Sequence, residues 1–242
     1  GGGRGPGAQG FLQRRTQFFK DEGVLAVISA GRGDGGTVFL GGGGSREPNA
    51  PAGLPTVVIA VEHYGRIVRT LERKMPVTIE MDVKNSFHDD VTSFNVVAEI
   101  PGTDRADEVV MLGGHLDSWH TATGATDNAI GCAVMMEAAR ILTAIGVRPR
   151  RTIRVALWSG EEQGLLGARA YVAQHFNTPA ARDRLAVYLN DDPGSGKTLG
   201  FYMEGNAPAK ALFDRWLTPL ADLGATRNII ESIGATDHVP FN

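Results

Sequence analysis

The sequence predicts an α/β protein, a three-layer sandwich with a mostly parallel central sheet, preceded by a β-rich region. Two observations support this prediction. From residue 93 onward, apolar runs of strand length alternate with amphipathic runs of helix length, as in successive strand–helix–strand units. Clusters of Asp, Glu and His follow the apolar runs, which is typical of ligand sites at the carboxyl ends of parallel strands.

The composition excludes several classes of function. The chain has 242 residues, of which 42% are hydrophobic and 21% charged, values that are ordinary for a globular protein. Its net charge of −3 offers no basic face to nucleic acid or to an anionic membrane, so we expect neither as a partner. No apolar run approaches the roughly 18 residues of a membrane-spanning helix. The single cysteine, Cys132, cannot form an internal disulfide.

The elements before residue 80 are short and are separated by Gly- and Pro-rich segments. We divide the chain into a first domain of residues 1–80 and a second domain of residues 81–242. Helical spacing of apolar residues predicts helices in the first domain, and β-branched runs predict strands. The predicted helices span 11–23 and 62–73, and the predicted strands span 24–29, 37–40, 56–61 and 77–83.

The second domain contains the regular alternation of strands and helices. Strands are predicted at 94–100, 108–112, 151–158 and 185–190, and helices at 128–146, 164–176 and 208–224. The run GSGKT at 194–198 resembles the end of a nucleotide-binding loop. Such a loop needs a Gly where Asp191 stands and a helix afterwards, whereas the following LGFYMEGN predicts a strand. We therefore expect no nucleotide site.

Polar residues follow the first buried strand of this domain and precede its first helix. His115 and Asp117 follow the strand; imidazole is the commonest protein ligand of zinc, and a carboxylate often fixes its tautomer. Asp127 directly precedes the helix, a position where Asp also serves as an N-cap. Each of these residues, taken alone, has an ordinary explanation as a turn residue or a helix cap.

Two pairs of acidic residues repeat the pattern at the next strand ends. Glu161 and Glu162 lie between glycines, where one can bind a metal ion while its neighbour serves as a general base. Asp191 and Asp192 follow the last predicted strand. The three strand ends together mix nitrogen and oxygen ligands, as zinc prefers. A bridging carboxylate would let them hold two ions about 3.5–4 Å apart, so we predict a two-metal site.

The motifs GGHLDSW, GATDNAIG, WSGEEQGLLGARAY and NDDPGSG resemble those of the co-catalytic zinc exopeptidases, the family that includes plasma glutamate carboxypeptidase (carboxypeptidase Q) and secreted bacterial aminopeptidases. The resemblance covers essentially all of residues 93–242, and the motifs are specific in type and order. Residues 1–80 resemble part of the protease-associated domain that many members carry. The resemblance implies a peptide substrate and hydrolysis of its terminal bond, with two Zn²⁺ ions per complete domain.

The resemblance also implies a role for each site residue. Glu161 would be the general base, and Asp117 would orient His115. The family shows an Asp, one further residue and then a Gly at the third strand end, which selects Asp192 over Asp191. The metal ligands would be His115, Asp127, Glu162 and Asp192, with Asp127 bridging both ions.

The chain departs from the family pattern near its end. The family takes the last ligand of the second zinc from a His well after the TDH segment, and no such His follows His238 here. The family gives His238 itself no place among the ligands. We therefore expect a chain truncated at both ends, which begins inside the inserted domain and has no useful peptidase activity by itself.

Two relatives of the same architecture remain as alternatives, a non-catalytic receptor ectodomain and a single-zinc enzyme that cyclises N-terminal glutamine. The intact ligand positions argue against the first, and the protease-associated segment argues against the second. By resemblance to exported members we expect a secreted or periplasmic protein, and a homodimer is compatible with the family. The sequence leaves the choice between aminopeptidase, carboxypeptidase and dipeptidase open.

Overall fold

The computed structural model describes residues 6–39, 53–86, 88–119, 121–192 and 194–242 of the chain. The chain forms two compact units, residues 3–90 and residues 91–242. Within the described ranges, no helix combines the length and apolarity that crossing a membrane requires.

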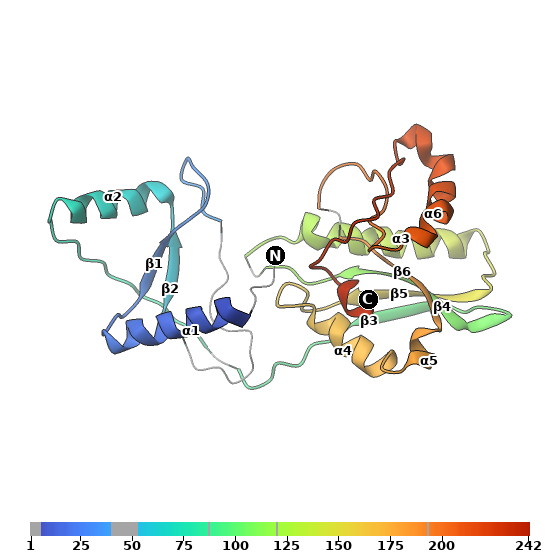
Figure 1. Ribbon diagram of the computed structural model, residues 1–242, viewed down its shortest axis with the longest axis horizontal. Coiled ribbons are helices and arrows are strands. Elements are labelled where there is room, and N and C mark those ends of the chain that lie inside the picture. The colour runs from blue at the N-terminus through green and yellow to red at the C-terminus, as the bar shows by residue number, and fades with distance from the viewer. Residues whose placement is uncertain (1–5, 40–52, 87, 120, 193) are drawn as a thin grey trace. The chain divides into compact units, whose positions relative to one another are not determined.

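The first unit contains two helices and a small sheet (Figure 1). Its elements are α1 (Pro6–Asp21), β1 (Val27–Ala30), β2 (Thr56–Ile59) and α2 (Val61–Glu72), and β1 pairs with β2 in parallel. These match the predicted helices and strands in place and type. The strand predicted at 77–83 is wrong, and so is the one at 37–40 over residues 37–39, since these form no ladder with any described residue; residue 40 lies outside the described residues. Alternating apolar residues cannot stabilise a strand whose backbone groups lack a neighbouring strand.

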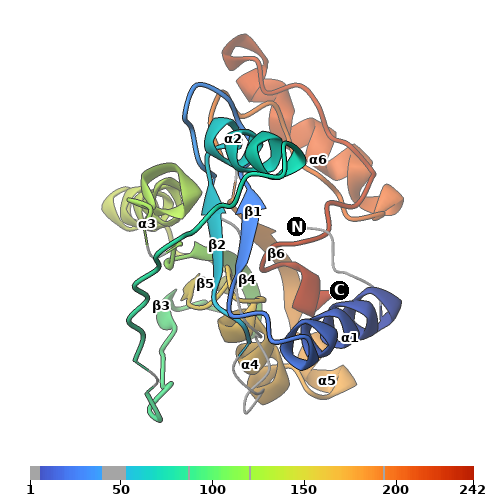
Figure 2. The same cartoon turned by 90° about the vertical axis from the view of Figure 1, so that its left-hand side faces the viewer.

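The second unit contains a four-stranded sheet in the order β3–β5–β4–β6 (Figure 2). The strands are β3 (Val96–Ile100), β4 (Arg105–His115), β5 (Arg151–Trp158) and β6 (Leu185–Asn190). β4 runs parallel to both β5 and β6, while β3 is antiparallel to β5. His115 pairs with Trp158 and Gly113 pairs with Asn190, so three strands end at the same edge of the sheet.

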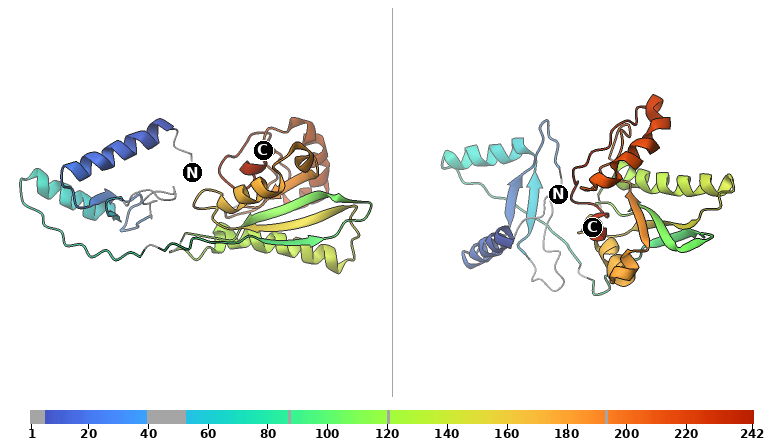
Figure 3. Two further views of the ribbon diagram at one scale, coloured as in Figure 1. Left: turned by 90° about the horizontal axis from the view of Figure 1, so that it is seen from below. Right: turned by 45° about the vertical axis from the view of Figure 1, so that its right-hand side comes forward.

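Helices cover both faces of this sheet, which confirms the predicted α/β sandwich (Figure 3, left). Helix α3 (Ile130–Ala144) lies on one face and α4 (Leu166–His175) on the other. On the α4 face, Trp158 is fully buried and its ring lies 5.0 Å from that of Tyr171. Met111 and Ala156 belong to the same buried cluster, so this aromatic packing links β4 and β5 to α4.

The remaining helical segments follow β5 and β6. Helix α5 (Pro179–Arg182) precedes β6, and α6 (Lys210–Leu217) falls within the helix predicted at 208–224, where 3₁₀ turns flank it. The strand predicted over 199–206 is wrong: the described backbone makes only one bridge there, between Tyr202 and Ile229. Residues 194–198 are not followed directly by a helix, since the next helical turn begins at Ala207.

Candidate metal centre

The predicted site residues lie together where the carboxyl ends of β4, β5 and β6 meet. His115 is the last residue of β4, Glu161 and Glu162 lie in the loop after β5, and Asp191 and Asp192 follow β6. The carboxyl ends of adjacent parallel strands form the ligand-binding crevice of many α/β sheets. The strand register therefore explains why His115 and Asp192, which are 77 positions apart in sequence, converge at the ends of parallel strands joined by helices.

His115, Asp127 and Asp192 form one compact group whose potential ligand atoms all lie within 4.8 Å of one another. The His115 Nε2 atom lies 3.0 Å from Asp127 Oδ1 and 3.6 Å from Asp192 Oδ1. Three atoms bound tetrahedrally to zinc at its usual bond lengths lie about 3.3 Å from each other. The two distances from His115 Nε2 lie close to that value, as expected for ligands of one zinc ion.

The His115 ring provides an independent test of that fit. Its side chain is only 1% exposed, yet its Nε2 atom has no hydrogen-bond partner among the described residues. A buried polar atom without a partner costs free energy. The Nδ1–H group donates a hydrogen bond to the backbone carbonyl of Asp117 at 2.9 Å, and this leaves Nε2 facing the two carboxylates. A dication bound at Nε2 would satisfy the ring nitrogen and both acids.

The charges around His115 favour a positive charge at the same point. Burial alone lowers the pKa of His115, but the carboxylates of Asp117 and Asp192 beside it raise that pKa to about 11. In return, the imidazole holds the pKa of Asp192 below its usual range. Without an ion the ring therefore carries a proton, which a zinc ion would replace because it needs the neutral imidazole.

Asp127 is held in place by the turn that precedes α3. This turn, Ala125–Ala129, has a non-helical backbone at Asp127 and Asn128, and a cis peptide bond joins these two residues. The Asn128 side chain donates to the backbone carbonyl of Asp191 at 2.8 Å, which ties the turn to the end of β6. The N-cap of α3 is Ala129, so the side chain of Asp127 does not cap that helix and is free to face His115.

Gly131 allows the start of α3 to approach the site so closely. A Cβ atom at Gly131 would lie 2.2 Å from the backbone oxygen of Asp191 and 2.3 Å from Asn128 Oδ1. Real Cβ atoms do not tolerate such distances. Gly131, the last residue of the GATDNAIG motif, therefore lets α3 pack close enough to bring Asp127 to the metal group.

Asp117 connects the ends of β4 and β5. Its carboxylate accepts the backbone N–H of Glu161 at 3.0 Å and that of Glu162 at 3.3 Å. The same carboxylate lies 3.7 Å from the Nδ1 atom of His115, while the carbonyl of Asp117 lies at 2.9 Å. The main contact of Asp117 with the ring is thus through its backbone, and its side chain holds the glutamate loop.

The two glutamates occupy partly buried positions in that loop. Burial raises the pKa of Glu161 to about 7, and neighbouring carboxylates add to the shift against the opposing charge of His115. Burial also raises the pKa of Glu162, whose Oε1 atom is buried without a hydrogen-bond partner among the described residues. Glu162 is not a member of the compact group formed by His115, Asp127 and Asp192.

The segment after α6 contributes residues whose position the sequence did not reveal. Asp237 is fully buried, and neither of its carboxylate oxygens has a hydrogen-bond partner among the described residues. Burial raises the pKa of Asp237 to about 8, and the charge of Glu161 adds to the rise. His238 instead faces Glu204, with its Nε2 atom 3.3 Å from Glu204 Oε1, and it does not join the metal group.

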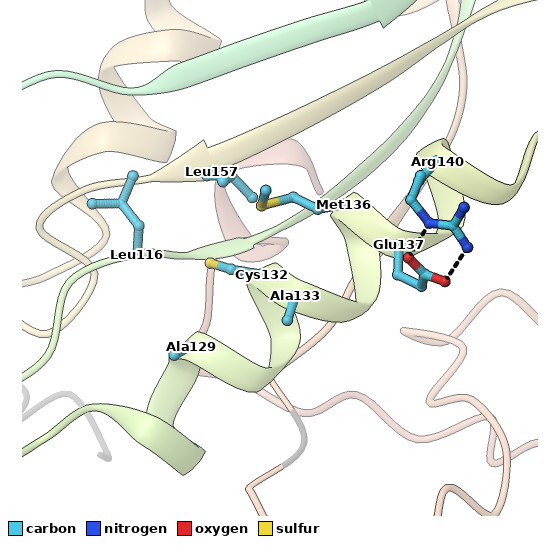
Figure 4. A pocket seen from close by; sticks show the side chains of 8 residues that line it. All are labelled: Leu116, Ala129, Cys132, Ala133, Met136, Glu137, Arg140 and Leu157. Carbon is cyan, nitrogen blue, oxygen red and sulfur yellow. Dashed lines mark hydrogen bonds and ion pairs between the residues drawn. The ribbon is translucent and has the colours of Figure 1, made fainter. Parts of the chain in front are cut away.

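A hollow of about 580 Å³ lies between α3 and the ends of β4 and β5 (Figure 4). Its wall is mainly apolar, and the ion pair of Glu137 and Arg140 marks one end. Cys132 lines this hollow and donates a hydrogen bond to the backbone carbonyl of His115 at 3.0 Å. None of the predicted metal ligands lines the hollow, so we do not assign it to the substrate.

Two named proteins are similar to this chain in sequence. Carboxypeptidase Q of Xenopus laevis is 34% identical over 173 residues, which cover 72% of this chain and 36% of that protein. Leupeptin-inactivating enzyme 1 of Streptomyces exfoliatus is 34% identical over 152 residues, which cover 62% of this chain and 33% of that protein. The chain thus matches about a third of the length of these relatives.

Solved structures of similar proteins show the same fold. A peptidase M28 precursor from Shewanella amazonensis has a TM-score of 0.74 at 27% identity, over 94% of this chain and 51% of its own. A zinc aminopeptidase from Bacillus subtilis has a TM-score of 0.50 at 28% identity, over 61% of this chain and 36% of its own. Residues 95–242, more than half of the chain, match the family model for Peptidase family M28. The chain therefore belongs to Peptidase family M28.

Proposed function

We propose that this chain forms the catalytic part of a zinc-dependent exopeptidase that hydrolyses terminal peptide bonds with two zinc ions and Glu161 as general base. The observation that carries the proposal is the buried Nε2 atom of His115, which faces the carboxylates of Asp127 and Asp192 without a hydrogen bond. Membership of a peptidase family supports the same conclusion. Carboxypeptidase and aminopeptidase both appear among the names of its relatives.

In the proposed site, His115 and Asp192 hold the first zinc ion and Glu162 holds the second. Asp127 would be a ligand of both, which its position 3.0 Å from His115 Nε2 and the rise that its charge causes in the pKa of Glu162 support. The buried, unpartnered Oε1 atom of Glu162 is the observation that favours a second ion. When bound, the ions polarise the scissile carbonyl and lower the pKa of the attacking water toward 7.

Glu161 performs the proton transfer in this proposal. It takes a proton from the attacking water and gives it to the leaving amine, a role that typically contributes a factor of about 10²–10⁴. Burial suits the task because it raises the carboxylate's affinity for a proton. Asp117 supports the base through the two backbone N–H groups that its carboxylate accepts.

Three further features are part of the proposal by family resemblance. Residues 1–80 form part of a protease-associated domain, the substrate is a peptide, and the protein is secreted or periplasmic. The names of the relatives include enzymes for either chain end, so the proposal covers an aminopeptidase or a carboxypeptidase.

The proposal is tested by assays of peptide hydrolysis. Purified protein is assayed on dipeptides, amino-acyl chromogenic substrates and a peptide with N-terminal glutamine, before and after removal of metal by a chelator. We expect release of terminal amino acids that is lost with the metal and restored by zinc. Cyclisation without hydrolysis, or zinc binding with neither reaction, would replace the proposal with one of the alternative functions.

A further inference from the structure

The loop that carries Glu161 and Glu162 is closed at its base by direct backbone contact. The carbonyl of Ser159, the first residue after β5, accepts the N–H of Gly167 at 2.8 Å. Further along, the carbonyl of Glu161 accepts the N–H groups of Gly164 and Leu165 at 2.8 and 2.9 Å. The loop is therefore a compact turn whose base is formed by Ser159 and Gly167.

The side chain of Asn95 completes this base from outside the loop. Its Oδ1 atom accepts the N–H of Ser159 at 3.1 Å, and its Nδ2 atom donates to the carbonyl of Gly167 at 3.0 Å. The Asn95 carboxamide thus makes hydrogen bonds with both residues that close the loop, Ser159 and Gly167, as the backbone of a neighbouring strand would. Asn95 directly precedes β3 and lies 64 residues from Ser159 in sequence, so the contact joins the start of β3 to the end of β5.

Gly167 permits this contact because it has no side chain. A Cβ atom at Gly167 would lie 2.2 Å from Asn95 Oδ1 and 2.5 Å from the carbonyl oxygen of Ser159. Neither distance is tolerated in a packed protein. The base of the loop is consequently built around the carboxamide of Asn95, with no room for a larger residue at position 167.

The glutamates lie between two anchors. Asp117 holds the backbone N–H groups of Glu161 and Glu162, and Asn95 holds the base of the loop. A general base acts efficiently only when its distance and direction to the proton are fixed, and supporting hydrogen bonds fix them. We propose, on the basis of the proposed function, that Asn95 is a positioning residue for the general base Glu161.

The test compares two substitutions of Asn95 with a matched control in the natural, zinc-loaded protein. N95A removes both hydrogen bonds, and N95D keeps the size and the acceptor but loses the donor to Gly167. The control is N228A, because Asn228 also makes two bridging hydrogen bonds, from the N–H of Phe201 at 3.3 Å and to Asp214 at 2.9 Å. Folding of each variant is checked by thermal unfolding before kinetics are measured.

We expect both Asn95 variants to lower kcat by about tenfold or more, as loss of supporting partners around a site often does. KM should change by less than about threefold, because the substrate contacts remain. In an E161Q background the same substitutions should lower kcat by less than about twofold, because residues that act through one another are non-additive. Equal losses in both backgrounds, or a kcat equal to that of N228A, would overturn the proposal.

Amide hydrogen exchange tests the role of Asn95 without reference to activity. Residues 159–167 should exchange faster in N95A and N95D than in the unmodified protein or in N228A, because the base of the loop opens more often. Unchanged exchange would overturn the inference. If the unmodified protein hydrolyses no peptide, the proposed function is wrong, and the exchange result alone decides whether Asn95 holds the loop.

Discussion

The carboxylate of Asp117 accepts a hydrogen bond from the backbone N–H of Glu161 at 3.0 Å. Asp117 stands just after β4, and Glu161 stands in the loop after β5, so this bond fixes one strand end against the other. The backbone carbonyl of the same aspartate lies 2.9 Å from the Nδ1 atom of His115. One residue therefore supports both the proposed zinc ligand and the proposed general base, through different atoms.

This arrangement predicts different results for two substitutions of Asp117. D117A removes the acceptor of two N–H groups and should lower kcat by about 10–100-fold. D117N keeps one oxygen acceptor but turns an amide N–H₂ toward a second donor, so its kcat should fall between those of D117A and the unmodified protein. Both are measured at saturating zinc and substrate. A D117A protein with unchanged kcat would contradict the supporting role.

Removal of the charge of Glu161 should separate catalysis from metal binding. E161Q keeps the shape of the side chain but cannot accept the proton, so kcat should fall by at least about 10²-fold. Zinc content should stay the same because Glu161 is not among the proposed ligands. Zinc is counted by elemental analysis beside the kinetic assay, and near-normal turnover would show that another group is the base.

The two aspartates after β6 should differ in their effect on zinc. Asp192 Oδ1 lies 3.6 Å from the Nε2 atom of His115, whereas Asp191 contributes its backbone carbonyl to Asn128 and is outside the metal group. D192A should weaken zinc binding by at least about 10–100-fold, and D191A should weaken it much less. Competition with a fluorescent chelator measures both, and the reverse ranking would mean that the ligand is misassigned by one residue.

A methyl group at Gly167 should destabilise the fold. G167A places a Cβ atom 2.2 Å from Asn95 Oδ1, and overpacking of this kind typically costs about 1–3 kcal/mol. Gly234 is a matched control, since no atom lies within 4 Å of a Cβ built there. Urea unfolding of G167A and G234A gives the two free energies of unfolding. Equal stability would show that the base of the glutamate loop can open to accept a side chain.

The 242-residue chain expressed by itself should bind one zinc ion more tightly than a second. His115, Asp127 and Asp192 supply three ligands to the first ion, the usual number for a catalytic zinc site. The proposal gives the second ion only Asp127 and Glu162. Dialysis followed by zinc counting should therefore leave about one ion per chain. Two ions retained after dialysis would show that another residue, such as His238, completes the second site.

Much of the sheet could be predicted from the sequence because its strands are apolar runs bounded by polar residues. The predicted bounds 151–158 and 185–190 are those of β5 and β6. The runs at 37–39 and 77–83 show the same local pattern but form no ladder. Whether a β-like run becomes a strand depends on a partner elsewhere in the chain, which the local pattern does not reveal.

Part of the candidate site could also be predicted from the sequence. His115, Asp127 and Asp192 could be found because they are unusual residue types at strand and helix ends, and the structure brings these three together. Asn95 gave no such signal, and Asp237 could be placed in a loop near the end of the chain but not given a role. Asn95 matters through hydrogen bonds to residues 64 and 72 positions away, and Asp237 through complete burial beside the site. Both properties arise only when the sheet and the following loops have packed.

The most direct test of the proposed zinc site is an anomalous difference map recorded at the zinc absorption edge from crystals of the zinc-loaded protein. The account predicts a strong peak within bonding distance, about 2.0–2.2 Å, of His115 Nε2 and of the carboxylates of Asp127 and Asp192. A zinc peak at another place, with His115 Nε2 bonded only to protein or water, would contradict it.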